Sequence, residues 1–100
     1  MLGNKKIMDI FGQIAARIIR EQALIIGPLA WNEARKVGGL LVSDPTGEVV
    51  LEGDKKQAID NLVARYDRLF GRASHEVSRK AVAGLLADLP LTDVPVSLQS

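Results

Sequence analysis

A long amphipathic stretch at residues 4–26 constrains the fold more than any other part of the chain. Its apolar side chains recur at three- and four-residue spacing with charged side chains opposite them, which is typical of an amphipathic helix. They are Ile7, Ile10, Phe11, Ile14, Ile18 and Ile25. Further apolar residues between them widen the apolar arc to about half of the circumference. We therefore expect the helix to pack against two elements, one of which can belong to another subunit.

Glycine and proline residues divide the rest of the chain into short elements. Gly27 and Pro28 end the first helix, and Gly71 separates the last two. Asp44-Pro45-Thr46-Gly47 suits a type I turn between two strands. The expected elements are helices at residues 4–26, 28–37, 55–70 and 72–87, and strands at residues 40–43 and 48–52.

These elements predict an α+β fold, dominated by helices, with the order α-α-β-β-α-α and one β-hairpin. At 100 residues the chain is long enough for one domain and too short for two independent cores. We expect a single globular domain at residues 1–90. Because Pro90 and Pro95 prevent a helix from continuing, we expect residues 91–100 to form an extended or disordered tail.

The composition argues against several classes of site. There is no cysteine, which excludes disulfides and thiolate chemistry and fits a reducing compartment. With 13 basic and 12 acidic residues the formal net charge is +1, so no overall field favours nucleic acid or a membrane. No apolar run reaches the roughly 20 residues of a membrane span, and charges interrupt the N-terminal apolar stretch before a signal sequence forms. We expect a cytoplasmic protein.

We expect no enzyme, cofactor or metal ion. His75 is the only histidine, and a metal ligand or general base would need a convergent partner that the sequence does not provide. The glycines form no phosphate-binding loop, and the serines form no nucleophile elbow. His75 is interpreted as a locally bonded residue at the edge of an apolar helix face.

The favoured function is a protein–protein interaction or homodimerisation module. An isolated hairpin is marginally stable in water, so it must lie on a helix or extend its sheet across a partner. The half-apolar first helix also leaves more apolar surface than so small a domain is expected to cover. The residues expected to contact the partner, together with the hairpin edge, are Leu2, Ile7, Phe11, Ile14, Ile18 and Trp31.

The alternative is a nucleic-acid-binding regulator that uses basic pairs on its helices. These pairs are Arg35-Lys36, Lys55-Lys56 and Arg79-Lys80, with Lys5-Lys6 near the start of the chain. Acidic residues lie between them on the same helices, and only 4% of the residues are aromatic and able to stack on bases. Solvated helix faces are therefore the favoured interpretation, and a nucleic-acid partner is the less favoured one.

A weak internal repeat relates the two halves of the chain. An offset of 44 residues aligns Gln13 with Gln57, Gly27 with Gly71, Arg35 with Arg79 and Lys36 with Lys80. The shared pattern is a long amphipathic helix, a glycine and a shorter helix. Since two helices of equal period match apolar positions automatically, the identities leave a true duplication open.

Two short segments resemble known families. The segment Ile26-Gly27-Pro28-Leu29-Ala30 is similar to small helical domains at the ends of bacterial signalling proteins. The strand pair within residues 40–51 resembles that of roadblock-type dimerisation domains. The resemblance implies a role in bacterial signalling or regulation, and it implies no site residues.

Overall fold

The computed structural model describes residues 9–43 and 47–99. Within them, four α-helices and one antiparallel hairpin follow the predicted order α-α-β-β-α-α, with two short 3₁₀ helices after them. The elements are α1 (Ile10–Ile26), α2 (Leu29–Ala34), β1 (Leu40–Ser43), β2 (Glu48–Leu51), α3 (Lys55–Phe70), α4 (Arg72–Leu86), η1 (Leu91–Asp93) and η2 (Val96–Leu98). The predicted turn at residues 44–46 lies outside the described residues.

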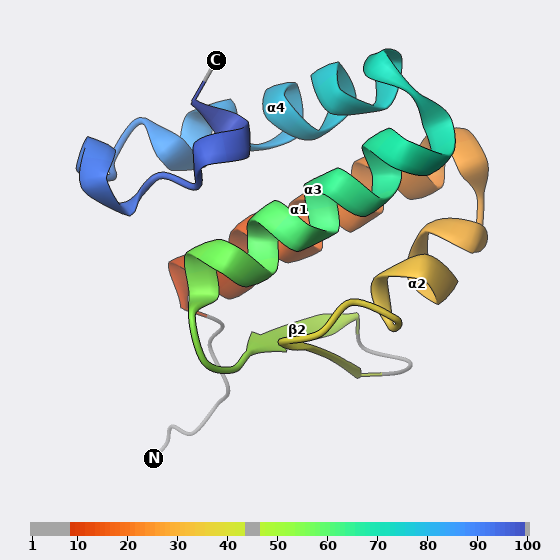
Figure 1. The fold of residues 1–100 in the computed structure, drawn as a ribbon, viewed down its shortest axis with the longest axis horizontal. Coiled ribbons are helices and arrows are strands. Elements are labelled where there is room, and N and C mark those ends of the chain that lie inside the picture. The colour runs from red at the N-terminus through yellow and green to blue at the C-terminus, as the bar shows by residue number, and fades with distance from the viewer. Residues whose placement is uncertain (1–8, 44–46, 100) are drawn as a thin grey trace.

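Helix α1 is the central element of the fold. In Figure 1 it lies behind α3, with the hairpin below, α2 at one end and α4 above. It packs against α2, β2, α3 and α4 of its own chain, rather than against the two elements expected. Neighbours within the chain therefore cover most of the apolar arc of α1, part of which was expected to contact another subunit.

The start of α1 differs from the predicted helix at residues 4–26. Asp9 is extended, with ψ at 176°, and its carboxylate accepts a hydrogen bond of 2.8 Å from the backbone N–H of Gly12. An N-cap of this kind satisfies a backbone donor in the first turn, which is why the helix begins at Ile10. Apolar spacing alone did not reveal this helix start.

The hairpin forms where it was predicted, and its side chains alternate between core and solvent. Leu40 pairs with Leu51 and Val42 with Val49, and these side chains point toward the helices. Leu41 pairs with Val50, and both face outward. This alternation follows from the two-residue period of a strand with one covered face.

The junctions after α1 and α3 are built alike. Gly27 has φ 71° and Gly71 has φ 88°, a region that favours glycine. Each N–H bonds the carbonyl four residues earlier, at 2.9 Å from Ala23 and 2.8 Å from Asp67. The chain then turns toward the hairpin after Gly27 and toward the opposite side after Gly71 (Figure 1). The predicted helix-glycine-helix pattern thus occurs twice, while a common origin remains a hypothesis.

Buried polar contacts tie the helices together at two places. The amide nitrogen of Gln22 on α1 donates to the carbonyl oxygen of Ser74 at 2.9 Å and reaches the hydroxyls of Ser74 and Ser78 at 2.9 and 3.0 Å. The Tyr66 hydroxyl on α3 donates to the Ala30 carbonyl of α2 at 2.6 Å. Because each of these groups is buried, its bonds offset the cost of leaving water.

The C-terminal segment packs on the domain, so the prediction of an extended or disordered tail is wrong for residues 91–99. Val94 and Leu98 are buried in the core, and Pro95 is fully buried. Asp60 on α3 accepts hydrogen bonds from the Ser97 backbone N–H, at 3.0 Å, and from its hydroxyl. The prolines stop the helix as expected, but Val94, Pro95 and Leu98 supply the buried apolar area that holds the segment in place.

Candidate interaction surfaces

Of the residues predicted to form the partner contact, the four that the structure describes do not form one exposed surface. Ile14 and Ile18 are fully buried in the core of the single chain. Phe11 and Trp31 are partly buried and pack against that core. Leu2 and Ile7 lie outside the described residues. Ile14 and Ile18 are thus not accessible to a partner in this structure, because α3, α4 and the hairpin already cover α1.

Trp31 joins α2 to the hairpin. A Cβ atom added to Gly47 would lie 3.4 Å from Cη2 of Trp31, so the backbone at the end of the turn lies close to the indole ring. Gly47 has φ 74°, a conformation that also favours glycine. Trp31 therefore acts as an intrachain anchor for the hairpin, and the rest of its ring is only partly exposed.

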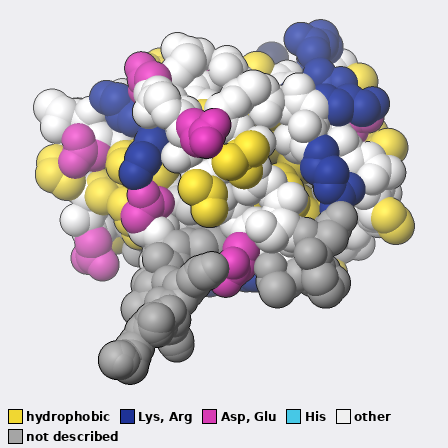
Figure 2. Space-filling view, turned by 90° about the horizontal axis from the view of Figure 1, so that it is seen from below, with side chains coloured by type: hydrophobic (Ala, Val, Ile, Leu, Met, Phe, Trp, Pro, Cys, Tyr) yellow, Lys and Arg dark blue, Asp and Glu magenta, His cyan; other side chains and the backbone are white. Residues whose placement is uncertain are grey.

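Exposed apolar side chains lie elsewhere than the sequence indicated. At the end of α1, Leu24 and Ile25 are 79% and 66% exposed. On the outer face of the hairpin, Leu41 and Val50 are 51% and 54% exposed and lie side by side as a cross-strand pair. Figure 2, seen from the hairpin side, shows hydrophobic side chains in the middle of this face with acidic side chains near them.

The hairpin edge at β1 is suited to pairing with another strand. A Glu52 N–H bond to the Gly39 carbonyl, at 2.9 Å, marks these residues as a hydrogen-bonded pair. Since such pairs alternate along an antiparallel ladder, Leu41 also bonds β2, and the N–H and C=O of Val42 point away from it. In the described part of the chain the sheet has only two strands, and β2 rather than β1 lies against α1.

The side chains of β1 carry none of the usual protection of an edge strand. Natural edges are blunted by charged residues or proline. Residues Leu40–Ser43 include neither, whereas β2 begins with Glu48 and is followed by Glu52. The sequence analysis named the hairpin edge as a contact, and among the described residues β1 is paired on one side only, with β2.

The basic pairs of the alternative hypothesis are dispersed and largely paired with acids or carbonyls. Lys5-Lys6 lies outside the described residues. The contacts of the others are Arg35 with Asn32, Lys36 with Glu33, Lys55 with Asp9, Lys56 with the Thr92 carbonyl and Arg79 with Glu76. Three of these contacts are local, and those of Lys55 and Lys56 reach residues far away in the sequence, so the basic side chains are held singly on the surface.

His75 has an acidic partner that the sequence did not reveal. Its Nδ1 lies 2.7 Å from Oδ2 of Asp67, across the Gly71 junction between α3 and α4. The two residues are eight positions apart and are brought together because the chain reverses at Gly71. Among the residues described, no group of three or more acidic or histidine side chains could hold a metal ion. The pair bridges two helices and is partly buried.

A cluster of cations that the sequence analysis missed lies between α3 and the segment after α2. Lys36, Arg65 and Arg68 line a hollow together with Val37, Gly38, Asn61 and Ala64. The spacing of Asn61, Arg65 and Arg68 places them on one face of α3, which was a detectable signal. Their approach to Lys36 could not be read from spacing, because it depends on how the α2 segment folds back.

Glu33 lies at the edge of this hollow and is the carboxylate that pairs with two of its cations. Its oxygens lie 2.7 Å from Nε of Arg65 and 3.3 Å from Nζ of Lys36. The Arg65 hydrogen bond, with Lys36 adding to it, lowers the pKa of Glu33 below its ordinary value of 4.5. Burial raises the pKa of Tyr66, and the negative charge of Glu33 raises it further. The Tyr66 hydroxyl therefore stays protonated and donates to the Ala30 carbonyl.

Comparison with family models, with curated proteins and with solved structures finds no match to this chain. None of the helices in the described ranges has the length and apolar character needed to cross a bilayer.

Proposed function

We propose that the chain is a non-enzymatic interaction module that pairs with a second copy of itself through β1. The observation that carries the proposal is the uncharged β1 edge, whose Val42 N–H and C=O groups point away from β2. An edge of this kind is a template for another strand, and a symmetric dimer is the commonest way to satisfy it. The absence of cysteine supports a reducing compartment such as the cytoplasm.

A twofold axis beside Val42 gives the simplest geometry. Val42 of each copy would then exchange two backbone hydrogen bonds with its counterpart, and the strands would follow the order β2-β1-β1-β2. Leu41 would lie diagonal to its counterpart, about 7 Å away, and Val50 would extend the same apolar row. No like charges meet along β1, because its four residues are Leu40, Leu41, Val42 and Ser43.

Two matched lysine substitutions test this geometry. Leu41→Lys places a charge about 7 Å from its counterpart across the axis, well within reach of repulsion. Val50→Lys places the same charge on the same face of the hairpin, but three strand spacings, about 14 Å, from its counterpart, beyond the screening length of about 8 Å. Both side chains are about half exposed, so both variants should fold.

The measurement is self-association by sedimentation equilibrium, with circular dichroism as the check on folding. We expect Leu41→Lys to weaken association at least about tenfold, a change of about 1.4 kcal/mol, and Val50→Lys to weaken it much less. Equal effects of the two variants would contradict pairing through β1.

A further inference from the structure

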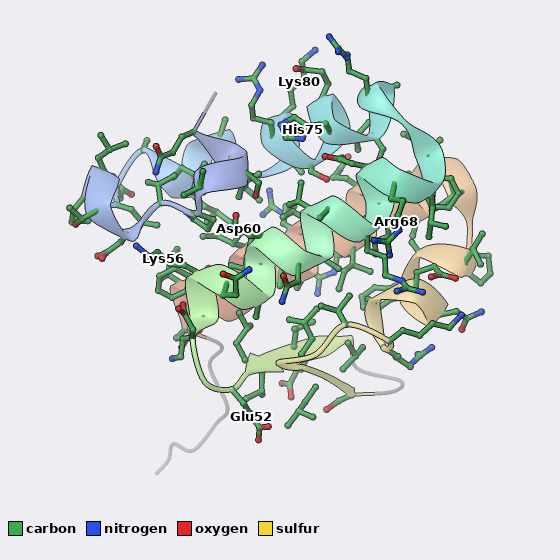
Figure 3. All side chains as sticks on the ribbon, in the orientation of Figure 1. Glu52, Lys56, Asp60, Arg68, His75 and Lys80 are labelled. Atoms are coloured by element: carbon green, nitrogen blue, oxygen red, sulfur yellow. The ribbon has the colours of Figure 1, made fainter. Side chains whose placement is uncertain are left out.

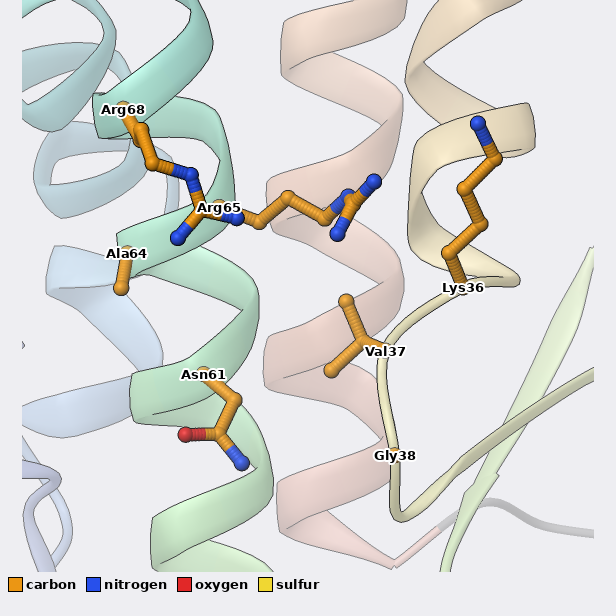
Figure 4. Close-up of a pocket in the computed structure, with 7 residues that line it drawn as sticks. All are labelled: Lys36, Val37, Gly38, Asn61, Ala64, Arg65 and Arg68. Atoms are coloured by element: carbon orange, nitrogen blue, oxygen red, sulfur yellow. The ribbon is translucent and has the colours of Figure 1, made fainter.

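The cationic hollow beside α3 has the form of a small-anion site. Figure 4 shows it between α3 and residues 36–38, with Val37 between the two walls. Arg65 extends across the hollow from α3, while Lys36 rises from the opposite wall. The cavity has a volume of about 270 Å³ and opens to solvent.

The charges around the hollow do not balance. Lys36, Arg65 and Arg68 contribute three positive charges, and Glu33 contributes one negative charge, so three minus one leaves a local charge of +2. Elsewhere among the described residues, Lys55 forms an ion pair with Asp9, and Arg79 forms one with Glu76. Three cations in one hollow repel one another unless a counter-charge joins them.

Two of the lining side chains still have donors to offer. Arg68 has no ion-pair or hydrogen-bond partner among the residues that the structure describes, and its guanidinium carries five N–H donors. Asn61 uses its carbonyl oxygen to accept a 2.9 Å bond from Gln57, which leaves its amide nitrogen as a donor. In Figure 4 the amide nitrogen of Asn61 lies on the side that faces Val37 and Gly38.

We propose that this hollow binds the phosphate group of a small phosphorylated molecule. A phosphate monoester carries a charge of about −1.5 to −2 at pH 7, which matches the local charge of +2, and its three oxygens suit planar guanidinium forks. A carboxylate would neutralise only half of that charge. Arg68 and Asn61 donate to the phosphate oxygens, and Lys36 supplies charge from the opposite wall.

The arrangement favours a single phosphate over a nucleic-acid strand. A strand needs a continuous basic track with aromatic side chains for its bases. Here the cations gather in one hollow, and Lys55 and Arg79 on other parts of the surface are paired with acids. In Figure 2, Lys and Arg side chains lie in separate groups at the two sides of the face, with acidic side chains among and between them, and they form no continuous track on this face.

The test is an NMR titration of the full chain with inorganic phosphate and with a sugar monophosphate, following the Gly38 backbone amide. Acetate at the same ionic strength is the carboxylate control, and a single-stranded oligonucleotide is the polyanion control. Arg68→Ala removes the unpaired guanidinium. Lys80→Ala removes the same charge from α4, away from Arg68 (Figure 3).

We expect saturable shifts at Gly38 with both phosphate probes and weaker shifts with acetate. Arg68→Ala should reduce the affinity about tenfold or more, because a hydrogen bond to a charged group is lost, and Lys80→Ala should leave it unchanged. Shifts that do not saturate, or an equal loss in both variants, would show that only net charge matters. Binding of the oligonucleotide without binding of either phosphate probe would replace this proposal by the nucleic-acid alternative. These outcomes are independent of whether β1 pairs.

Discussion

Replacing Gln22 by leucine should destabilise the fold through the polar contacts between α1 and α4. The Gln22 amide nitrogen has two N–H donors for three acceptor atoms on Ser74 and Ser78, all at 2.9 to 3.0 Å. The leucine side chain is one atom shorter and cannot donate. Each buried polar group left without a partner costs about 1–3 kcal/mol, and a helical serine hydroxyl can recover part of this by bonding a carbonyl of its own helix.

We therefore expect Gln22→Leu to lower the free energy of unfolding by about 2 kcal/mol and the melting temperature by about 10 °C. Urea denaturation followed by circular dichroism measures both the midpoint and the slope. A matched variant that combines Gln22→Leu with Ser74→Ala and Ser78→Ala removes the acceptor hydroxyls as well. Its stability should return to within about 1 kcal/mol of the parent, because only the Ser74 backbone carbonyl then remains of the three acceptors.

A Gln22→Leu variant as stable as the parent would refute this reasoning, since it would mean that the three contacts contribute nothing. A combined variant less stable than Gln22→Leu would also contradict it. In that case the serine hydroxyls stabilise α4 independently of Gln22.

Three further perturbations have defined outcomes. Deleting residues 91–100 should lower the free energy of unfolding by about 2 kcal/mol or more, because the buried side chains of Val94, Pro95 and Leu98 are lost; an unchanged urea midpoint would show that the segment does not dock in solution. Tyr66→Phe should cost about 1–2 kcal/mol in the same assay, since the buried Ala30 carbonyl loses its donor, and a loss below about 0.5 kcal/mol would contradict that bond. The lowered pKa of Glu33 means that its contribution to stability is present above about pH 4.5 and is lost as the pH falls through the lower folded value. Glu33→Gln should flatten this part of the stability profile, and a slope equal to that of the parent would show that the Arg65 pair does not form.

The sequence predicted elements well where local signals agreed. Residues 55–70 form α3 as expected, since Asp54 caps the helix and Gly71 ends it. The hairpin followed from two apolar strands around a turn sequence, while its register is known only from the structure. In these segments propensity, stop residues and apolar period all indicate the same structure.

The errors arose where the outcome depends on contacts between distant segments. The half-apolar first helix was expected to pack against two elements, one of which could belong to another subunit, but it packs against α2, β2, α3 and α4 of its own chain. The C-terminal segment has too few apolar residues to predict its order, and it is held by Asp60, a residue 37 positions away from Ser97. The His75–Asp67 pair and the cationic hollow likewise depend on chain reversals that spacing does not encode.

The most direct test of the proposed function is the mass of the wild-type protein in solution, measured by light scattering over a range of concentrations. Pairing through β1 predicts a mass that rises from 10.8 kDa toward twice that value as the concentration increases. It also predicts that Leu41→Lys suppresses the rise while Val50→Lys preserves most of it. A wild-type mass that stays at 10.8 kDa up to about millimolar concentration, where an affinity of only about 4 kcal/mol would be visible, would contradict the proposal.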